Sequence, residues 1–426
     1  MLRIRVAGGR KLNGCVEIQG SKNAALPILA ATVLTDGKVT IDNCPDISDT
    51  EDMRRLLKML GISAARNGAR LEIDSRYIKS NHLCCGGSEA SRSAVFFMSV
   101  LLARFGRAVI PYPGGCAIGK RPIDIHISAL KKMGACIAEI YDSTLGKHLY
   151  CAADRLKGAD ITLPFPSVGA TENILLAAVT AEGITRIFNY AKEPEIDALC
   201  DFLNAVGADI HKSSKTLVIN GVDKLKSVSN LYFRLPGDRI VAGTYMLLVA
   251  AAGGAAKLNG INPQHLQCLN GLLVSAGCII DAADSSLEIK REGELRAVGN
   301  VITEPYPGFP TDLQSQLIAA MIFADGETKI CESIFEDRYK VVPELCKLGA
   351  DIEISNEFAK IKGKKEIYGA LVNSSELRGG AALVIAGAAA CGETIVCDNG
   401  YIKRGYEDIC RDVKTLGGEI SFRNGD

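Results

Sequence analysis

The sequence has no excess of charge of either sign. Its 426 residues include 49 Lys plus Arg and 49 Asp plus Glu, so the formal net charge is zero. A general nucleic-acid binder should carry a basic excess on at least one face, so the composition argues against that class of protein. A local cationic pocket remains compatible with a neutral chain.

Long hydrophobic runs are also missing. The longest apolar stretch, Val241 to Ala256, is rich in Gly and Ala and is shorter than the roughly 20 residues that a membrane span requires. The first five residues carry charges with no apolar run behind them, so we expect no secretion signal. We therefore expect a cytoplasmic protein without a membrane-spanning segment.

The common metal-binding motifs do not occur either. The sequence has no Cys-x-x-Cys pair and no His-Glu-x-x-His run, which leaves little support for a metal site. It does contain 15 cysteines, and Cys200 and Cys410 lie among apolar neighbours at helical spacing. We expect most of these cysteines to be small buried hydrophobic residues in a reducing cytosol.

An internal repeat runs through the whole chain. Apolar residues make up 47% of a chain that is too long for one ordinary core, so several units that share cores are expected. One signature, an amphipathic helix that ends in a glycine turn, recurs every 68 to 73 residues. Its glycines are Gly61, Gly134, Gly207, Gly277, Gly349 and Gly417. Each glycine is expected to end its helix in the left-handed conformation.

Each repeat is predicted to have the order β-α-β-α-β-β. An apolar helix, such as residues 26–34 or 313–323, should be buried, and the half-polar helix that precedes the glycine should face water. Six such units most simply form two pseudo-threefold α/β domains of three units each. Pro236-Gly237 marks a turn near the expected break between them.

Basic residues recur at the starts of these helices. Helix N-termini present unpaired N–H groups and partial positive charge, so they are natural anion sites. The residues that would complete a pocket for a multiply anionic ligand are Lys22, Arg92, Arg121, Arg338, Arg378 and Arg404. Any one of these, taken alone, is more often a surface residue, and Asp312 could simply be a first-turn acid of its helix. The recurrence at equivalent positions favours a shared pocket.

The second repeat contains an unusually long, glycine-rich loop over residues 111–122. Glycines permit a mobile segment that closes over a substrate. Cys116 lies on this loop, five residues before Arg121, where packing gives no reason for a cysteine. Cys116 is therefore a candidate for chemistry, although most cysteines in a chain with 15 of them are structural.

These motifs resemble those of the enolpyruvyl transferase family, in the branch that acts on UDP-N-acetylglucosamine, within the EPSP synthase superfamily. The resemblance covers essentially the whole chain. Its most specific segments are residues 20–27, 113–116, 118–119, 121–124, 309–312, 335–338 and 404–407. It implies a two-domain inside-out α/β barrel with the active site in the cleft between domains. The implied domains are residues 22–235 and residues 1–21 plus 236–426.

The resemblance also implies substrates and residue roles. Phosphoenolpyruvate would donate its enolpyruvyl group to the sugar 3-hydroxyl, and no metal or organic cofactor is implied. Lys22, Arg121 and Arg404 would bind phosphoenolpyruvate with help from Arg338 and Arg378, Cys116 would protonate C3, and Asp312 would act on the hydroxyl. The implied contacts to the sugar nucleotide are Asn23, Arg92, Arg121, Pro122, Ile123, Asp124, Ile125, Asp312 and Ile334.

Two segments depart from the family pattern, and two other functions stay open. Phe165-Pro166 replaces a charged residue before the Ser-Val-Gly segment, and Pro236-Gly237-Asp238 contains an extra glycine at the expected domain junction. The first alternative is the sister enzyme that uses shikimate 3-phosphate, which typically has Ser at the position of Asn23 and lacks the cysteine loop. The second is a non-catalytic binder of UDP-sugars.

Overall fold

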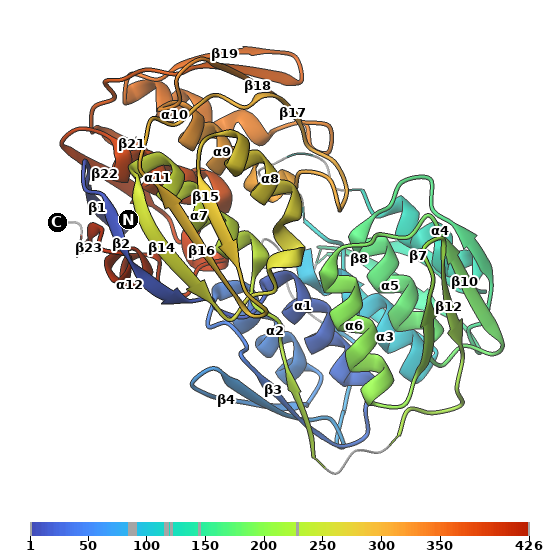
Figure 1. The fold of residues 1–426 in the computed structure, drawn as a ribbon. Helices are drawn as coiled ribbons and strands as arrows, with labels where there is room; N and C mark the ends of the chain where they lie inside the picture. The colour runs from blue at the N-terminus through green and yellow to red at the C-terminus, as the bar shows by residue number, and fades with distance from the viewer. Residues whose placement is uncertain are drawn as a thin grey trace. The chain divides into compact units, whose positions relative to one another are not determined.

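The computed structural model describes residues 2–83, 92–114, 119, 122–143, 146–226 and 230–424. The chain divides into two compact units, and Figure 1 labels their helices and strands where there is room. The described residues of the C-terminal unit are 2–19, 119 and 237–424, and the N-terminal unit contains the rest, from 20 to 236. The unit bounds differ from the predicted domain bounds at residues 20, 21, 119 and 236.

The N-terminal unit contains three small sheets within its described residues. Their strand orders are β13-β3-β5-β4, β6-β8-β7 and β11-β12-β10-β9. The strands are β3 (Lys38–Asp42), β4 (Ser63–Asn67), β5 (Arg70–Asp74), β6 (Arg107–Pro111), β7 (Cys136–Asp142), β8 (Gly146–Ala152), β9 (Asp160–Thr162), β10 (Ile184–Phe188), β11 (Asp209–Lys212), β12 (Thr216–Asn220) and β13 (Leu231–Arg234). The helices are α1 (Lys22–Ala31), η1 (Thr32–Leu34), α2 (Ser48–Met59), η3 (Arg92–Ala94), α3 (Val95–Phe105), α4 (Asp124–Lys132), α5 (Val168–Ala178) and α6 (Pro194–Ala205).

The described part of the C-terminal unit also forms three sheets. Their orders are β15-β16-β14-β2, β17-β18-β20-β19 and β21-β22-β1-β23. The strands are β1 (Leu2–Ala7), β2 (Leu12–Glu17), β14 (Gly254–Asn259), β15 (Ile279–Ala282), β16 (Ser286–Arg291), β17 (Gly299–Ile302), β18 (Glu327–Cys331), β19 (Asp351–Ser355), β20 (Phe358–Lys362), β21 (Leu371–Asn373), β22 (Glu393–Asp398) and β23 (Glu419–Asn424). The helices are α7 (Arg239–Ala252), η4 (Pro263–Leu266), α8 (Gln267–Ser275), η5 (Thr311–Leu313), α9 (Gln314–Met321), η6 (Arg338–Val341), α10 (Val342–Lys347), α11 (Leu377–Ala389), η7 (Ile402–Arg404) and α12 (Ile409–Thr415).

The sheets repeat one pairing pattern. In the fifth repeat, β17 is parallel to β18, and the β19–β20 hairpin extends the sheet antiparallel to β18. The third repeat has the same arrangement in β9, β10, β11 and β12. In the second repeat, a single parallel bridge from His82 to Val109 stands where the other sheets have their first strand. The predicted repeat order is confirmed by this pattern, except that the second repeat has this bridge in place of its first strand.

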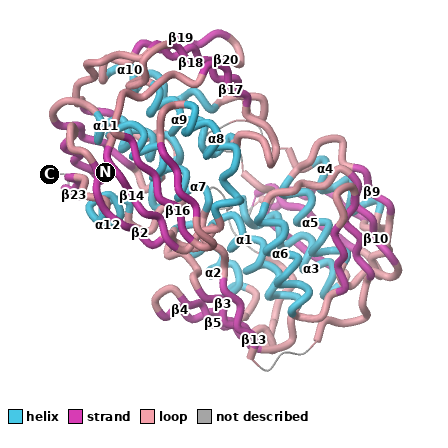
Figure 2. The backbone as a smooth tube through the Cα atoms, in the orientation of Figure 1, coloured by secondary structure: helices cyan, strands magenta, loops and turns pink. Residues whose placement is uncertain are grey.

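The apolar helices form the two cores. Helices α7, α9 and α11 pack against one another in the C-terminal unit, and α3 packs against α1 and α5 in the N-terminal unit. Almost every residue of these six helices is buried, whereas α2, α4, α8 and α10 bury only one face. Figure 2 shows strands around the outside of the helices in the N-terminal unit. The predicted contrast between buried and water-facing helices is confirmed for α2, α4, α8 and α10, whereas α6 buries eight of its 12 residues and departs from it.

The repeated glycines end the second helices as predicted. All six have φ between 84° and 96°, the left-handed region that a glycine adopts without steric cost. Some helix bounds differ from the prediction: the helix expected over residues 26–34 begins at Lys22, because Ser21 caps it by accepting a hydrogen bond from the Ala24 N–H at 3.3 Å. Residues 32–34 continue α1 as the 3-10 turn η1.

Two strands are exchanged between the units. In sequence, β2 precedes α1, yet it pairs with β14 in the C-terminal unit, and β13 precedes α7, yet it pairs with β3 in the N-terminal unit. Two hydrogen bonds join the segment that follows β2 to the segment that follows β13. They run from the Ser21 N–H to the Pro236 carbonyl at 2.8 Å and from the Asp238 N–H to the Gln19 carbonyl at 2.9 Å. The extra Gly237 lies here, and a Cβ on it would come 2.1 Å from the Gly260 carbonyl oxygen. Close backbone approach therefore accounts for that glycine.

Seven of the described cysteines are buried, one is half-buried and four are exposed. Cys200 and Cys410 are among the buried ones, and burial raises the pKa of each thiol to about 12.

Across the described ranges, none of the helices combines the length and the apolar character needed to cross a bilayer.

Candidate active site

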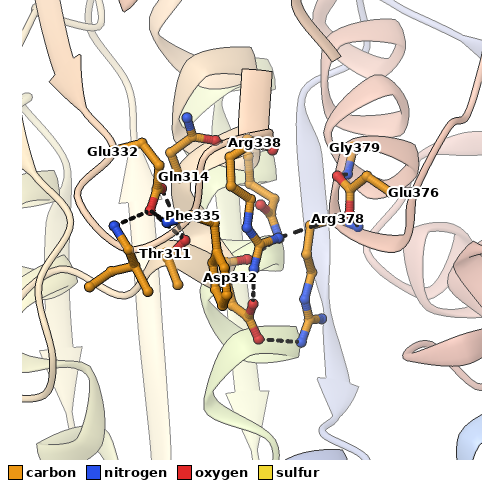
Figure 3. A network of polar contacts seen from close by, with 12 residues as sticks. Thr311, Asp312, Gln314, Glu332, Phe335, Arg338, Glu376, Arg378 and Gly379 are labelled. Carbon is orange, nitrogen blue, oxygen red and sulfur yellow. Dashed lines mark hydrogen bonds and ion pairs between the residues drawn. The ribbon is translucent and has the colours of Figure 1, made fainter. Parts of the chain in front are cut away.

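Asp312 lies between two arginines in the C-terminal unit, as Figure 3 shows. It belongs to the 3-10 turn η5, which leads into the buried helix α9. Arg338 Nη2 is 2.6 Å from Asp312 Oδ1, and Arg378 Nη2 is 3.1 Å from Asp312 Oδ2. The structure brings these three predicted residues into contact, although 66 residues separate Asp312 from Arg378.

Both guanidinium groups are almost completely buried. The side chains of Arg338 and Arg378 are each 3% exposed, whereas that of Asp312 is 25% exposed. Arg338 lies over the Phe335 ring at 5.2 Å, and Arg378 lies over the Tyr406 ring at 5.9 Å. Burial is the largest single effect on Arg378 and lowers its pKa, but Asp312, Tyr406 and Asp238 together raise it by more, so the net shift is upward.

The two arginines keep unused hydrogen-bond donors. Within the described part of the chain, Arg338 Nε and Arg378 Nη1 are buried and have no hydrogen-bond partner. A guanidinium group presents its donors in a planar fork that matches carboxylate and phosphate oxygens. The group of Asp312, Arg338 and Arg378 thus combines a carboxylate that can accept a proton with cations suited to an anionic ligand.

Glu376 fixes the backbone that carries Arg378. It is the N-cap of α11, and its carboxylate accepts the N–H of Arg378 at 2.8 Å as well as the N–H of Gly379. The same carboxylate lies 3.9 Å from Arg338 Nη1. Glu376 was not predicted as a site residue, and its position one residue before the helix was the available signal for a cap.

Three buried polar side chains, Gln316, Thr244 and Tyr406, form a hydrogen-bond network next to Asp312. Gln316 Nε2 donates to the Asp312 backbone oxygen at 2.9 Å and lies 3.3 Å from Thr244 Oγ1. The Tyr406 hydroxyl is 2.8 Å from the same threonine oxygen. Burial raises the pKa of Tyr406, against the Arg378 guanidinium, which lowers it. This network connects α7, α9 and the segment after Arg404, and it holds the backbone carbonyl of Asp312 in place.

The segment that carries Arg404 is held by Gln19. Arg404 is half-buried at the end of η7. The Gln19 amide donates from Nε2 to the Gly405 carbonyl at 3.1 Å and accepts the Glu407 N–H at Oε1 at 2.8 Å. Gln19 is three residues before Lys22, so one short stretch of chain contacts the Arg404 segment and then leads to the predicted lysine. Gln19 was not predicted, because an amide that binds distant backbone has no local sequence signal.

Lys22 lies in the N-terminal unit, in the first turn of α1. Its Nζ is 2.7 Å from Asp49 Oδ2, and the two side chains are 12% and 7% exposed. Asp49 is in the first turn of α2, where an acidic residue is favoured by the helix dipole. Lys22 was predicted to bind an anionic ligand, with a surface position as the alternative. Its pairing with Asp49 was not predicted.

The other predicted contacts to a sugar nucleotide lie at helix starts of the N-terminal unit. Asn23 follows Lys22 in α1 and is half-buried, as is Arg92 at the start of η3. At the start of α4, Pro122 and Asp124 are exposed, Ile123 is 3% exposed and Ile125 is half-buried.

The remaining predicted residues are distributed as follows. Ile334 is half-buried in the C-terminal unit, between β18 and Arg338. Cys116 and Arg121 lie outside the described residues. Gly119 of the same loop lies against Glu336, since a Cβ on Gly119 would meet the Glu336 carboxylate. Within the described ranges, no group of three or more His, Cys, Asp or Glu side chains could hold a metal ion.

The fold is that of the enolpyruvyl transferases. Over the full length of both chains it matches the enolpyruvyl transferase NikO from Streptomyces tendae, with a TM-score of 0.87 and 22% sequence identity. It also matches an EPSP synthase from Acinetobacter baumannii over the full length of both chains, with a TM-score of 0.74 and 17% identity. At these identities the likeness concerns the fold alone.

Sequence comparison identifies the family to which the chain belongs. Residues 6–413 match the family described as EPSP synthase (3-phosphoshikimate 1-carboxyvinyltransferase), and the chain belongs to this family. The chain is 42% identical to UDP-N-acetylglucosamine 1-carboxyvinyltransferase 2 from Caldanaerobacter subterraneus subsp. tengcongensis over 421 residues, which are 99% of each chain. It is 41% identical to UDP-N-acetylglucosamine 1-carboxyvinyltransferase from Chlorobaculum parvum over 424 residues, 99% of this chain and 98% of that protein.

Proposed function

We propose that this protein transfers the enolpyruvyl group of phosphoenolpyruvate to the 3-hydroxyl of UDP-N-acetylglucosamine, with release of phosphate. The observation that carries the proposal is the exposed edge of Asp312 between two buried arginines. The full-length similarity to relatives with this activity in their names supports it. In this role the protein would catalyse the first committed step of peptidoglycan synthesis in the cytoplasm.

The chemistry accounts for the residue types. The sugar oxygen bonds to C2 of phosphoenolpyruvate and loses its proton, for which Asp312 is the proposed acceptor. C3 gains a proton, and we assign its donation to Cys116. The resulting adduct then loses a proton from C3 while the C2–O bond to phosphate breaks, so the enol ether and inorganic phosphate are the products. Phosphoenolpyruvate supplies both the carbon unit and the leaving group, and no cofactor enters this balance.

The cations neutralise phosphoenolpyruvate before the hydroxyl approaches. We assign Lys22, Arg121 and Arg404 to its phosphate and carboxylate, with Arg338 and Arg378 beside them. Positive charge from fixed groups stabilises the anion without reorganisation during the reaction. Since Lys22 belongs to one unit and Asp312 to the other, the proposal requires an active site in the cleft of a two-domain inside-out barrel.

The UDP-sugar would be bound mainly by helix starts of the N-terminal unit. We assign Asn23, Arg92, Arg121, Pro122, Ile123, Asp124 and Ile125 to this substrate, together with Asp312 and Ile334. The N–H groups at the start of a helix favour a diphosphate, and Arg92 adds charge. No nucleic acid or membrane partner is proposed.

The test measures phosphate release with two acceptors, UDP-N-acetylglucosamine and shikimate 3-phosphate. We expect release from phosphoenolpyruvate with UDP-N-acetylglucosamine and a product heavier by one enolpyruvyl group in mass spectrometry. Release with shikimate 3-phosphate instead would identify the sister activity. Binding of UDP-N-acetylglucosamine without release under any condition would identify a non-catalytic binder. Asp312→Asn, which preserves shape and removes the charge, should lower kcat by about 100-fold or more while the product stays the same.

A further inference from the structure

Glu332 is a buried carboxylate next to the candidate active site that the sequence did not single out. It follows β18 directly and is 3% exposed. Thr311 Oγ1 lies 3.0 Å from Glu332 Oε1 and 2.9 Å from Oε2, and the Oε1 atom also accepts the N–H groups of Ile334 at 3.0 Å and Phe335 at 3.2 Å. Figure 3 shows this carboxylate on the opposite side of Asp312 from Arg378.

These hydrogen bonds join two separate segments that both lead to the site. Thr311 immediately precedes Asp312. Ile334 and Phe335 lead to Arg338, which pairs with Asp312 at 2.6 Å. The contacts thus close a ring: Glu332 holds the Thr311 side chain before Asp312 and the backbone N–H groups of the loop before Arg338, and the ion pair between Asp312 and Arg338 joins the two segments.

A stacked contact between Arg338 and Phe335 gives Glu332 a second connection to Arg338. The Arg338 guanidinium lies over the Phe335 ring at 5.2 Å. Since Glu332 accepts the Phe335 N–H, it fixes the backbone of the residue on which Arg338 rests. Movement of Glu332 would therefore shift Asp312 through Thr311 and Arg338 through Phe335. A carboxylate suits this task because two oxygens offer four lone-pair sites, and hydrogen bonds to a charged acceptor are the stronger ones.

A simpler role is available and must be separated from this one. A Glu that accepts N–H groups two and three residues later stabilises its own turn, with no consequence for Asp312. The bond from Thr311 is the contact that such a turn does not need. Its removal leaves the turn intact and breaks only the connection to Asp312.

We propose that Glu332 is a positioning residue that, through Thr311, sets the Asp312 carboxylate against Arg338 and against the sugar hydroxyl. The inference rests on the proposed function. Glu332 touches no reacting atom in this scheme. Its effect is on how well Asp312 is aligned, and a misplacement of about 1 Å can cost roughly 100-fold in rate.

The experiment compares Thr311→Val with Thr311→Ser in the full-length protein. Valine has nearly the shape of threonine and lacks the hydroxyl, whereas serine keeps the hydroxyl and lacks the methyl group. We expect Thr311→Val to lower kcat by about 10- to 100-fold and Thr311→Ser to stay within about threefold of the wild type. The KM for phosphoenolpyruvate should change little in both, because the binding cations remain.

A double-mutant cycle with Glu332→Gln tests whether the two residues act through one connection. If they do, Thr311→Val should cost much less in the Glu332→Gln background than in the wild type. Thermal unfolding of every variant is measured alongside. A purely structural role would lower the unfolding midpoint of Thr311→Val and leave kcat per folded molecule unchanged.

The outcomes separate the inference from the proposed function. Wild-type protein that releases no phosphate with either acceptor overturns the function, and this inference with it. Active wild-type protein with equal kcat in Thr311→Val and Thr311→Ser overturns the inference alone. So do additive effects of Thr311→Val and Glu332→Gln. Reduced kcat in Thr311→Val, rescue in Thr311→Ser and non-additivity together support it.

Discussion

Lys22 has one observed and one proposed role. Its ammonium group lies 2.7 Å from Asp49 Oδ2, and both side chains are largely buried. In the proposed reaction the same ammonium group also binds the phosphoenolpyruvate anion. Loss of the lysine removes a cation from a mostly buried carboxylate, which costs about 3–5 kcal/mol of stability. Any effect of Lys22 substitution on activity therefore has to be separated from an effect on folding.

We predict that Lys22→Ala raises the KM for phosphoenolpyruvate by roughly 100-fold, because a charged contact to a bound anion is lost. Affinity for UDP-N-acetylglucosamine should change by less than about threefold. The double variant Lys22→Ala/Asp49→Asn is the control: it should recover thermal stability, since no unpaired charge remains, without recovering phosphoenolpyruvate use. Steady-state kinetics and thermal unfolding provide the readouts. An equal loss of both substrates in Lys22→Ala would contradict the assignment.

At the scale of single residues, the sequence indicated which residues come together better than it indicated which side chains hold them in place. Asp312, Arg338 and Arg378 are in contact, as expected if equivalent ends of repeated units converge. Their partners Glu332 and Glu376 were missed. A buried carboxylate looks like any surface glutamate in the sequence until its neighbours are known, and those neighbours come from the tertiary fold. The predicted roles of the site residues stay predictions until a substrate complex or kinetics test them.

At the scale of elements, α11 depends on an uncommon cap. Glu376 accepts the N–H groups of Arg378 and Gly379, although shorter Asp, Asn, Ser and Thr side chains are the usual N-caps. Its contact at 3.9 Å with Arg338 explains the longer side chain, which reaches the cap and the guanidinium at once. The start of this helix and the position of its arginine are thus fixed by one carboxylate.

We predict that Glu376→Ala weakens the first turn of α11 by about 1–2 kcal/mol, the usual value of a lost N-cap. Hydrogen exchange of peptides that cover residues 377–380 should accelerate about tenfold. Glu376→Asp should retain most of the protection, because aspartate also caps. The exposed Glu353 on β19 supplies the control, and Glu353→Ala should leave these amides within about 0.5 kcal/mol of the wild type. Unchanged exchange in Glu376→Ala would show that the cap does not hold the helix start.

The repeat made the elements predictable, and the exchange of strands limited that prediction. The six left-handed glycines and the alternation of buried and half-buried helices followed from periodicity. The pairing of β2 with β14 and of β13 with β3 did not follow from periodicity, and only the domain bounds implied by the family resemblance assigned these two strands to the units in which they pair. A pattern predicts which face of a strand is buried, but two equivalent edges satisfy it equally.

At the scale of the whole molecule, the N-terminal strand belongs to the unit that contains the C-terminus. β1 lies between β22 and β23 and pairs with both, so it is an interior strand of its sheet. Ile4 and Val6 face the core of the C-terminal unit with 0% and 1% exposure, whereas Arg3 is exposed. Each unit has its own hydrophobic core, so damage to β1 should remain within one of them.

We predict that Ile4→Ala destabilises the C-terminal unit by about 2–5 kcal/mol, since it leaves a cavity beneath an interior strand. Hydrogen exchange should accelerate in β22 and β23, which pair with β1, while β3 and β10 of the N-terminal unit keep their wild-type protection. Arg3→Ala on the same strand is the matched control and should change neither set. Equal loss of protection in both units after Ile4→Ala would mean that the two cores unfold together. That result would contradict the independence argued from their separate clusters of buried side chains, because a cavity in one cluster would then weaken the other to the same extent.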